Sequence, residues 1–357
     1  MNELEIAPLL RGLSFDGEKG AIVVFRETLG EAELVCAPEE LAAKFAPGIR
    51  SVKVEGVGGF LLGEDYDDAV GGTDEAPRAT GRAAVVRNKV CVVTGGAQGF
   101  GEGIVRELVA NGALVFVADL NAEGARRLAD ELNEKTGRTV AFGVAANVSD
   151  EDSVKAMIDE IVRTAGGIDL FVSNAGVLKA GSVKEMSLRD FRFVTDVNYV
   201  GFFLCTKHVA PVMEKMNAPT GRYFTDIVSI ASKSALEGSN KNGAYAGSKF
   251  GAVGLTQSFA KELTADHTKV NVVCPGNFFD GPLWSDPERG LFVQYLNAGK
   301  VPGAETVADV KAFYEAQVPM GRGCYPVDVT RAILYAVEQK YETGQAIPVT
   351  GGQVMLN

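Results

Sequence analysis

Two side chains that can exchange protons, Tyr245 and Lys249, lie four residues apart in a segment with helical periodicity. On a helix this separation makes the two side chains neighbours on one face. A free phenol has a pKa near about 10, and lowering that pKa by ~3 units requires about 4 kcal/mol of preferential stabilisation of the phenolate. A neighbouring ammonium, together with a second cation nearby, could supply this energy. The pair therefore indicates general acid–base chemistry on a substrate oxygen.

Two further polar residues precede this pair. Ser232 lies just past a predicted strand at 222–228, where its hydroxyl could donate a hydrogen bond to a substrate oxygen. Asn198 lies inside a predicted helix, where asparagine is unfavourable unless it has a role, such as holding a water in a proton path to Lys249. Taken singly, each residue is more often structural, and a lone Tyr-x-x-x-Lys pair arises by chance on many helices.

A glycine-rich turn lies between a predicted strand at 90–93 and a predicted helix at 102–111. Glycine allows the backbone to approach a pyrophosphate closely, and the free N–H groups of the following helix point at the phosphates. An ordinary turn is the alternative, because such patterns also match by chance. The turn predicts a dinucleotide site with these contacts: Gly95, Gln98, Gly99, Phe100 and Gly101.

An acidic residue, Asp119, ends the second predicted strand at 114–118. There its carboxylate can accept hydrogen bonds from the ribose hydroxyls of adenosine and would repel a 2′-phosphate. Because Leu120 and Asn121 follow and no arginine does, NAD is favoured over NADP. The alternative is that Asp119 caps the helix that begins near residue 122. Further candidate contacts close the third predicted strand: Asn147 and Val148.

The elements that must position these residues alternate between strands and helices from residue 89 onward. Apolar runs predict strands at 90–93, 114–118, 140–144, 168–172, 222–228, 270–273 and 346–349. Amphipathic segments predict helices at 102–111, 122–136, 150–165, 188–216, 244–265 and 328–338. This alternation predicts an α/β fold with a doubly wound parallel sheet.

The first part of the chain predicts a separate small unit. Short strands at 21–26, 51–55 and 58–62 with a helix at 38–46 indicate a small N-terminal α/β appendage over residues 1–66. The polar, glycine-rich segment 67–87 predicts a linker, and residues 88–357 form the main domain. Residues 50–63 resemble the end of the class II aldolase part of bifunctional aldolase/dehydrogenase chains, which marks the appendage as an aldolase remnant, an oligomer contact or a cover.

Composition argues against several classes of function. The formal net charge of −11 repels nucleic acid and anionic lipid, so neither partner is expected. Because no apolar run approaches membrane-spanning length and the N-terminus lacks a signal-peptide pattern, we expect a cytoplasmic protein. The 5 cysteines are scattered and only 2 histidines are present, so no zinc site of standard spacing is expected.

Taken in order, these motifs resemble those of the short-chain dehydrogenase/reductase family. The resemblance covers residues 89–357 and implies a single Rossmann-type domain acting as an NAD-dependent oxidoreductase. It rests on the glycine turn at 94–101 and on these further residues: Ser173, Asn174, Ala175, Gly176, Asn198, Ser232, Tyr245, Lys249, Pro275 and Gly276. The sequence departs from the family pattern at Ser173, where asparagine is usual, at Asn147, where aspartate is usual, and after Gly276, where a threonine is missing.

The resemblance also implies a role for each matched residue. Tyr245 would be the acid/base, and Lys249, beside a cationic nicotinamide, would lower the phenol pKa and bind the nicotinamide ribose. Ser232 would orient the substrate, and Asn198 would complete a proton relay. The remaining implied cofactor contacts are Asn174, Ala175, Gly176, Pro275, Gly276 and Asn277. The family further implies a homotetramer, with contacts through the helices around 198–216 and 244–265 and through the C-terminal strand.

Several segments are similar to family members that interconvert sorbitol 6-phosphate and fructose 6-phosphate with NAD, namely 232–234, 249–258, 318–324 and 343–355. A substrate phosphate carries about −1.5 to −2 charges and needs cations near it. The candidates are Lys179, Lys233, Lys241 and Arg289, although each is more often a solvated surface charge. Residues 278–318 predict a lid in which Trp284 and Phe292 close over the polyol, the alternative being an interface contact.

Other functions share these motifs. A dehydrogenase of another sugar or polyol, or a ketoacyl reductase, would use the same four residues with a different pocket. A protein of another class, which senses a dinucleotide without chemistry, would keep the fold alone. The presence of Ser232, Tyr245 and Lys249 argues against that last class.

Overall fold

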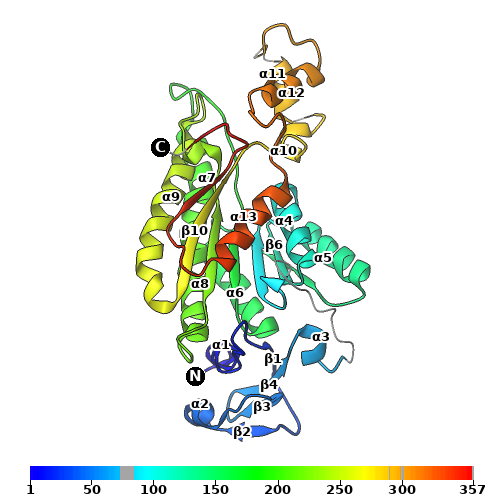
Figure 1. The fold of residues 1–357 in the computed structure, drawn as a ribbon, viewed down its shortest axis with the longest axis vertical. Helices are drawn as coiled ribbons and strands as arrows, with labels where there is room; N and C mark the ends of the chain where they lie inside the picture. The colour runs from blue at the N-terminus through cyan, green and yellow to red at the C-terminus, as the bar shows by residue number, and fades with distance from the viewer. Residues whose placement is uncertain (73–83, 289, 298, 300, 356–357) are drawn as a thin grey trace.

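The computed structural model describes residues 1–72, 84–288, 290–297, 299 and 301–355. A seven-stranded sheet covered by helices forms the body of the molecule (Figure 1). A four-stranded N-terminal unit lies at one end, and a helical segment with α10, α11 and α12 projects from the opposite end (Figure 1).

All seven predicted strands of the main domain are present, in the order β11-β10-β9-β8-β5-β6-β7. Every neighbouring pair is parallel. The apolar, β-branched runs become strands buried on both faces, as expected when helices cover both sides of a parallel sheet. The bounds are β5 (Val90–Thr94), β6 (Leu114–Asp119), β7 (Ala141–Ala145), β8 (Leu170–Ser173), β9 (Thr225–Ile230), β10 (Thr268–Pro275) and β11 (Ala346–Val349). The predicted α/β, doubly wound fold is confirmed.

Helices pack on both faces of this sheet, each through an apolar stripe. One apolar core joins the sheet to α4 (Gly99–Ala110), α5 (Ala122–Thr136) and α13 (Pro326–Glu338). The other core joins it to α6 (Glu151–Ala165), α8 (Gly201–Asn217) and α9 (Gly243–Leu263). The chain runs outward from β5 to β7 on one side and from β8 to β11 on the other. The carboxyl ends of β5 and β8 therefore flank the topological switch point, where α/β folds bind ligands.

The prediction of a single helix at 188–216 is wrong. The chain instead forms α7 (Leu188–Thr195), a π-helical turn η3 (Asp196–Val200) and then α8. Asn198 lies in the π-helical turn, and its side chain is hydrogen-bonded to the backbone of Val177 in another segment. Such single π turns inside helices are frequently found at functional sites.

The N-terminal unit is a small α/β fold, as predicted, with a sheet of order β1-β4-β3-β2. Its strands are β1 (Ile22–Arg26), β2 (Leu34–Cys36), β3 (Ser51–Val54) and β4 (Gly58–Gly63), and its helical elements are α1 (Glu3–Leu13), η1 (Pro38–Glu40), α2 (Leu41–Lys44) and α3 (Tyr66–Ala69). Neither β2 nor α1 was predicted, and α1 contains Pro8, a residue that usually interrupts a helix.

The predicted linker at 67–87 starts inside an ordered element, α3, which contacts the main domain. The Tyr66 ring packs edge-on against Phe142 with centroids 5.0 Å apart, and Asp65 forms an ion pair of 2.7 Å with Arg138. Residues 73–83 of that predicted linker lie outside the described residues.

The predicted lid at 278–318 contains three short helices, α10 (Pro282–Ser285), α11 (Leu291–Asn297) and α12 (Val307–Ala316). Trp284 is 7% exposed and packs against a ring of aromatic residues: Phe279, Phe292, Tyr295 and Tyr314. Trp284 and Phe292 therefore form the core of this segment, and they do not present the open surface over a polyol that the sequence analysis predicts. Burying a large aromatic surface stabilises a segment that is otherwise remote from the sheet.

Candidate active site

The glycine turn after β5 has the geometry of a phosphate cradle. Gly95 (φ 63) and Gly99 (φ 60) adopt left-handed conformations that favour glycine. A Cβ on Gly101 would collide with the carbonyl oxygen of Gly95 and lie 2.7 Å from Nδ2 of Asn174. Gln98 precedes α4 without a side-chain cap, so no side chain from that position occupies the first N–H groups of the helix. A diphosphate fits such a helix N-terminus.

Asp119, at the end of β6, faces this turn. Its Oδ2 accepts a hydrogen bond of 3.0 Å from the Ala97 N–H, and its Oδ1 accepts one of 2.8 Å from the Asn121 N–H. The alternative that Asp119 caps α5 is wrong, because Asn121 is the N-cap and accepts from the Gly124 N–H. Leu120 is exposed beside it. The carboxylate is thus held beside the glycine turn.

Asn174, after β8, ties the carboxyl ends of the two central strands together. Its Nδ2 donates to the carbonyl oxygens of Thr94 (2.9 Å) and Gly95 (3.1 Å). The Thr94 hydroxyl accepts from the N–H groups of Asn174 and Ala175 at 3.0 and 3.1 Å. The Asn174 side chain therefore stabilises the glycine turn, and both of its amide hydrogen bonds are made to the protein backbone.

The two candidate contacts that close the third predicted strand, Asn147 and Val148, make contacts within the protein. Oδ1 of Asn147 accepts hydrogen bonds from the N–H and hydroxyl of Ser149, at 3.2 and 2.7 Å. The Val148 side chain is buried, in close contact with Gly201 of α8. Local contacts thus involve the side-chain oxygen of Asn147 and the apolar side chain of Val148.

Tyr245 and Lys249 lie on one face of α9, as their spacing predicts, with Nζ of Lys249 5.7 Å from the centroid of the Tyr245 ring. Nζ also donates a hydrogen bond of 2.8 Å to the carbonyl oxygen of Ile230 at the end of β9. Burial lowers the pKa of Lys249 to about 8. Burial also raises the pKa of Tyr245, and a hydrogen bond with Ser232 opposes that rise.

Ser232 and Asn198 approach this pair from two other elements. Ser232 precedes a short 3₁₀ turn, η4 (Lys233–Ala235), and its hydroxyl accepts from the Ser234 N–H at 3.2 Å. Nδ2 of Asn198 donates to the Ser248 hydroxyl at 3.1 Å, and that hydroxyl donates to the Tyr245 carbonyl oxygen at 2.7 Å. Asn198 therefore reaches α9 through Ser248, a residue that the sequence analysis missed because Ser248 has no distinctive spacing.

Two of the four predicted residues, Asn198 and Lys249, converge near one glycine. A Cβ built on Gly176 would lie 3.4 Å from Oδ1 of Asn198 and 3.4 Å from Nζ of Lys249. Because no side chain fills this point, an amide oxygen and an ammonium lie within reach of a shared ligand or water. Such a constellation can hold a proton and pass it between groups.

The three predicted substrate lysines lie on two loops and a turn, and Arg289, the fourth predicted cation, lies outside the described residues. Lys179 and Lys241 are exposed, and the Gly181 N–H donates to the Lys241 carbonyl oxygen at 2.8 Å, which places their two loops side by side. Lys233 is half-buried in η4, directly after Ser232. Among the described residues, His, Cys, Asp and Glu side chains form no cluster of three or more that could hold a metal ion.

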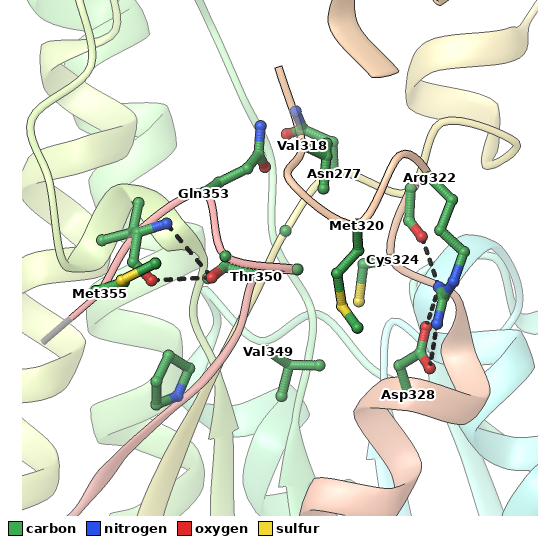
Figure 2. A pocket seen from close by; sticks show the side chains of 16 residues that line it. Asn277, Val318, Met320, Arg322, Cys324, Asp328, Val349, Thr350, Gln353 and Met355 are labelled. Atoms are coloured by element: carbon green, nitrogen blue, oxygen red, sulfur yellow. Dashed lines mark hydrogen bonds and ion pairs between the residues drawn. The ribbon is translucent and has the colours of Figure 1, made fainter. Parts of the chain in front are cut away.

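A pocket of about 620 Å³ opens at the carboxyl ends of β10 and β11 (Figure 2). Gly276 and Asn277, two predicted cofactor contacts, line it, and so do Thr350 and Gln353, which the sequence analysis did not assign. Ser232, Tyr245 and Lys249 are not in its lining. We therefore take the Tyr245 constellation, which carries the acid–base groups, as the candidate centre, and the pocket as a neighbouring space. None of the helices in the described part of the chain is both long and apolar enough to cross a membrane.

Comparisons with known proteins support the family that the sequence motifs indicate. Residues 89–284 match the model of the short chain dehydrogenase family. The chain is 36% identical over 270 residues to sorbitol-6-phosphate 2-dehydrogenase of Escherichia coli (strain K12), covering 75% of this chain and 99% of that protein. It is 30% identical over 273 residues to the 3-oxoacyl-[acyl-carrier-protein] reductase FabG of Thermotoga maritima, covering 76% and 99%.

A solved structure, that of sorbitol-6-phosphate 2-dehydrogenase SrlD from Erwinia amylovora, superimposes with a TM-score of 0.68 at 37% identity, covering 74% of this chain and 100% of that chain. Fold, site and comparisons define an oxidoreductase that acts on CH–OH groups with a nicotinamide cofactor. The chain belongs to the short-chain dehydrogenase/reductase family, and among known members it is similar to the sorbitol-6-phosphate 2-dehydrogenases.

Proposed function

We propose that the chain is an NAD-dependent dehydrogenase that interconverts a polyol phosphate and a ketose phosphate, with sorbitol 6-phosphate and fructose 6-phosphate as the pair. The observation that carries the chemistry is the half-buried Tyr245, with Ser232 close enough to lower the pKa of its hydroxyl and with Lys249 on the same face of α9. The substrate pair rests on the similarity to two sorbitol-6-phosphate 2-dehydrogenases over nearly their whole length.

In this proposal the hydroxyl of Tyr245 exchanges a proton with the substrate oxygen, and the Ser232 hydroxyl orients that oxygen. When bound, the nicotinamide supplies or accepts the hydride. Burial keeps Tyr245 protonated at neutral pH, which suits donation of its proton to a ketone oxygen. The oxidation direction requires the phenol to lose that proton first, so it is favoured at higher pH. Asn198 holds the start of α9 through Ser248.

The same proposal assigns the cofactor to the glycine turn. The residues around Gly95, Gly99 and Gly101 would hold the diphosphate, and Asp119 would accept hydrogen bonds from the adenosine ribose. The negative charge of Asp119 disfavours a 2′-phosphate, which is the basis for proposing NAD.

We further propose a homotetramer. Large apolar side chains are exposed on α8 and α9, among them Phe203 (42%) and Phe250 (45%). Exposed aromatic groups on adjacent helices are typical of contacts between subunits.

A panel of free and phosphorylated hexitols, assayed with NAD and with NADP by the absorbance of the reduced cofactor, tests the assignment. We expect NAD reduction with sorbitol 6-phosphate and little with free sorbitol. Reduction of a 3-oxoacyl thioester without any reaction on polyol phosphates would instead support the ketoacyl reductase, the second candidate, which the similarity to the Thermotoga reductase favours.

The phosphate assignment has its own test. Lys233 directly follows Ser232, and the proposal is that its ammonium binds the substrate phosphate. Lys233→Met should raise the KM for a phosphorylated polyol and spare the free polyol, because a phosphate needs a nearby cation. Lys184→Met, on the exposed segment after Val183, is the matched control. Equal effects of Lys233→Met on both substrates would exclude the phosphate role.

A further inference from the structure

The N-terminal unit, residues 1–72, lies outside the family match, which begins at residue 89. Three quarters of this chain (75%) already cover 99% of the length of the Escherichia coli relative. The unit lies at the end of the molecule opposite α10, α11 and α12 (Figure 1). There it meets the amino-terminal ends of the central strands β5 and β8.

A buried ion pair joins this unit to the main domain. Arg11, on α1, and Asp169, directly before β8, both have side chains that are 0% exposed. Nη2 of Arg11 donates to Oδ2 of Asp169 at 2.5 Å, and Nη1 donates to the carbonyl oxygen of Ala21 at 2.6 Å. A buried carboxylate without a partner is strongly unfavourable, so each group depends on the other.

Asp169 also connects the starts of several strands. Its Oδ2 accepts a hydrogen bond of 2.6 Å from the N–H of Val90, the first residue of β5. Its Oδ1 accepts one from the hydroxyl of Tyr223, which is buried shortly before β9. The Tyr223 hydroxyl in turn accepts from the Gly20 N–H of the N-terminal unit at 3.1 Å. One carboxylate thus holds together β5, β8 and the approach to β9.

Close packing surrounds this polar cluster. The rings of Phe15 and Tyr223 stack with centroids 4.6 Å apart. A Cβ on Gly12 would collide with the carbonyl oxygen of Met216 in α8, so the backbones of α1 and α8 are in direct contact there. Exposed ion pairs add a rim, for example Glu3 with Arg163 at 3.2 Å. Contacts of this kind are those of a protein interior.

We propose that the N-terminal unit is an integral part of the dehydrogenase fold in this chain, and that Arg11 supplies the counter-charge on which Asp169 and the amino-terminal ends of β5 and β8 depend. The segment after residue 88 spans the length of complete relatives, but in this chain its Asp169 carboxylate is buried against the N-terminal unit, and among the described residues Arg11 is its ion-pair partner. The stability of the segment therefore depends on the N-terminal unit.

Full-length variants test this dependence by thermal unfolding and by hydrogen exchange. Arg11→Met should lower the Tm by roughly 6–20 °C, the range expected when one partner of a buried ion pair is lost from a large domain. Exchange should increase in residues 1–26 and also in the peptides that hold β5 and β8. Arg163→Met, which removes an exposed pair between the same two parts, should shift the Tm by less than about 4 °C.

The double variant Arg11→Met/Asp169→Asn separates charge from packing. Because the double variant removes both charges, its Tm should recover at least half of the decrease caused by Arg11→Met. The double variant should also be soluble even if Arg11→Met is not. The proposal is overturned if the double variant is as unstable as the sum of the single variants or is itself insoluble. It is also overturned if increased exchange in Arg11→Met stays within residues 1–26.

Discussion

Lys249 gives the stability of this protein a specific dependence on pH. The lysine is 5% exposed, and burial lowers its pKa from 10.5 to about 8. The difference, 10.5 minus 8, is about 2.5 units, which corresponds to about 3.4 kcal/mol of preference for the neutral amine in the folded state.

The number of protons bound by the folded and unfolded states decides whether stability rises or falls with pH. Below pH 8 the amine is protonated in both the folded and the unfolded state, so its contribution to the free energy of unfolding does not change with pH. Between pH 8 and 10.5 the folded state has released the proton and the unfolded state still holds it. Stability therefore rises with pH across this window, by up to about 3.4 kcal/mol, because the unfolded state binds more protons. In Lys249→Met this contribution is absent.

Urea unfolding at several values between pH 7.5 and 10.5, followed by the fluorescence of Trp284, measures the effect. The free energy of unfolding of the unaltered chain, minus that of Lys249→Met, should increase by about 3 kcal/mol over this range. Lys233→Met, the same change on the neighbouring η4 turn, serves as the control and should show no such increase. Parallel pH profiles for the unaltered chain and Lys249→Met would refute the reasoning.

Two further predictions concern the cofactor. Asp119→Ser removes a negative charge beside the proposed ribose site. The proposed preference for NAD over NADP in kcat/KM should therefore fall by about 5–30-fold, equivalent to about 1–2 kcal/mol for a partly exposed charge, and an unchanged ratio would contradict the assignment. Gly101→Ala places a Cβ against Gly95, so NADH affinity in a fluorescence titration should fall by more than about tenfold. Gly247→Ala, whose Cβ would meet nothing within 4 Å, is its control, and equal affinities of the two variants would argue against the cradle.

The sequence was sufficient for much of the fold, since periodic patterns come from burial. The seven strands are buried on both faces, so their apolar runs are continuous and recognisable. The glycine turn is equally readable, because the collision at Gly101 restricts that position to one residue type. Tyr245 and Lys249 share a face of α9 because residues four apart on a helix are neighbours on its surface.

Contacts between distant segments could not be predicted in the same way. Nothing near Arg11 in the sequence indicates that a buried carboxylate 158 residues away is its partner. The π-helical turn at Asn198 depends on hydrogen bonds to Val177, which local propensity does not contain. The sequence predicts Trp284 as a substrate contact, with an interface contact as the alternative, whereas the rings of Phe279 and Phe292 place it in the core of its segment.

Turnover by Tyr245→Phe, measured together with NADH binding, tests the central claim most directly. The hydroxyl is the group proposed to exchange the substrate proton, so kcat with the polyol phosphate should fall by about 10²–10⁴-fold while the dissociation constant of NADH changes little. A variant that keeps turnover within about tenfold of the unaltered chain would contradict the acid–base role of Tyr245.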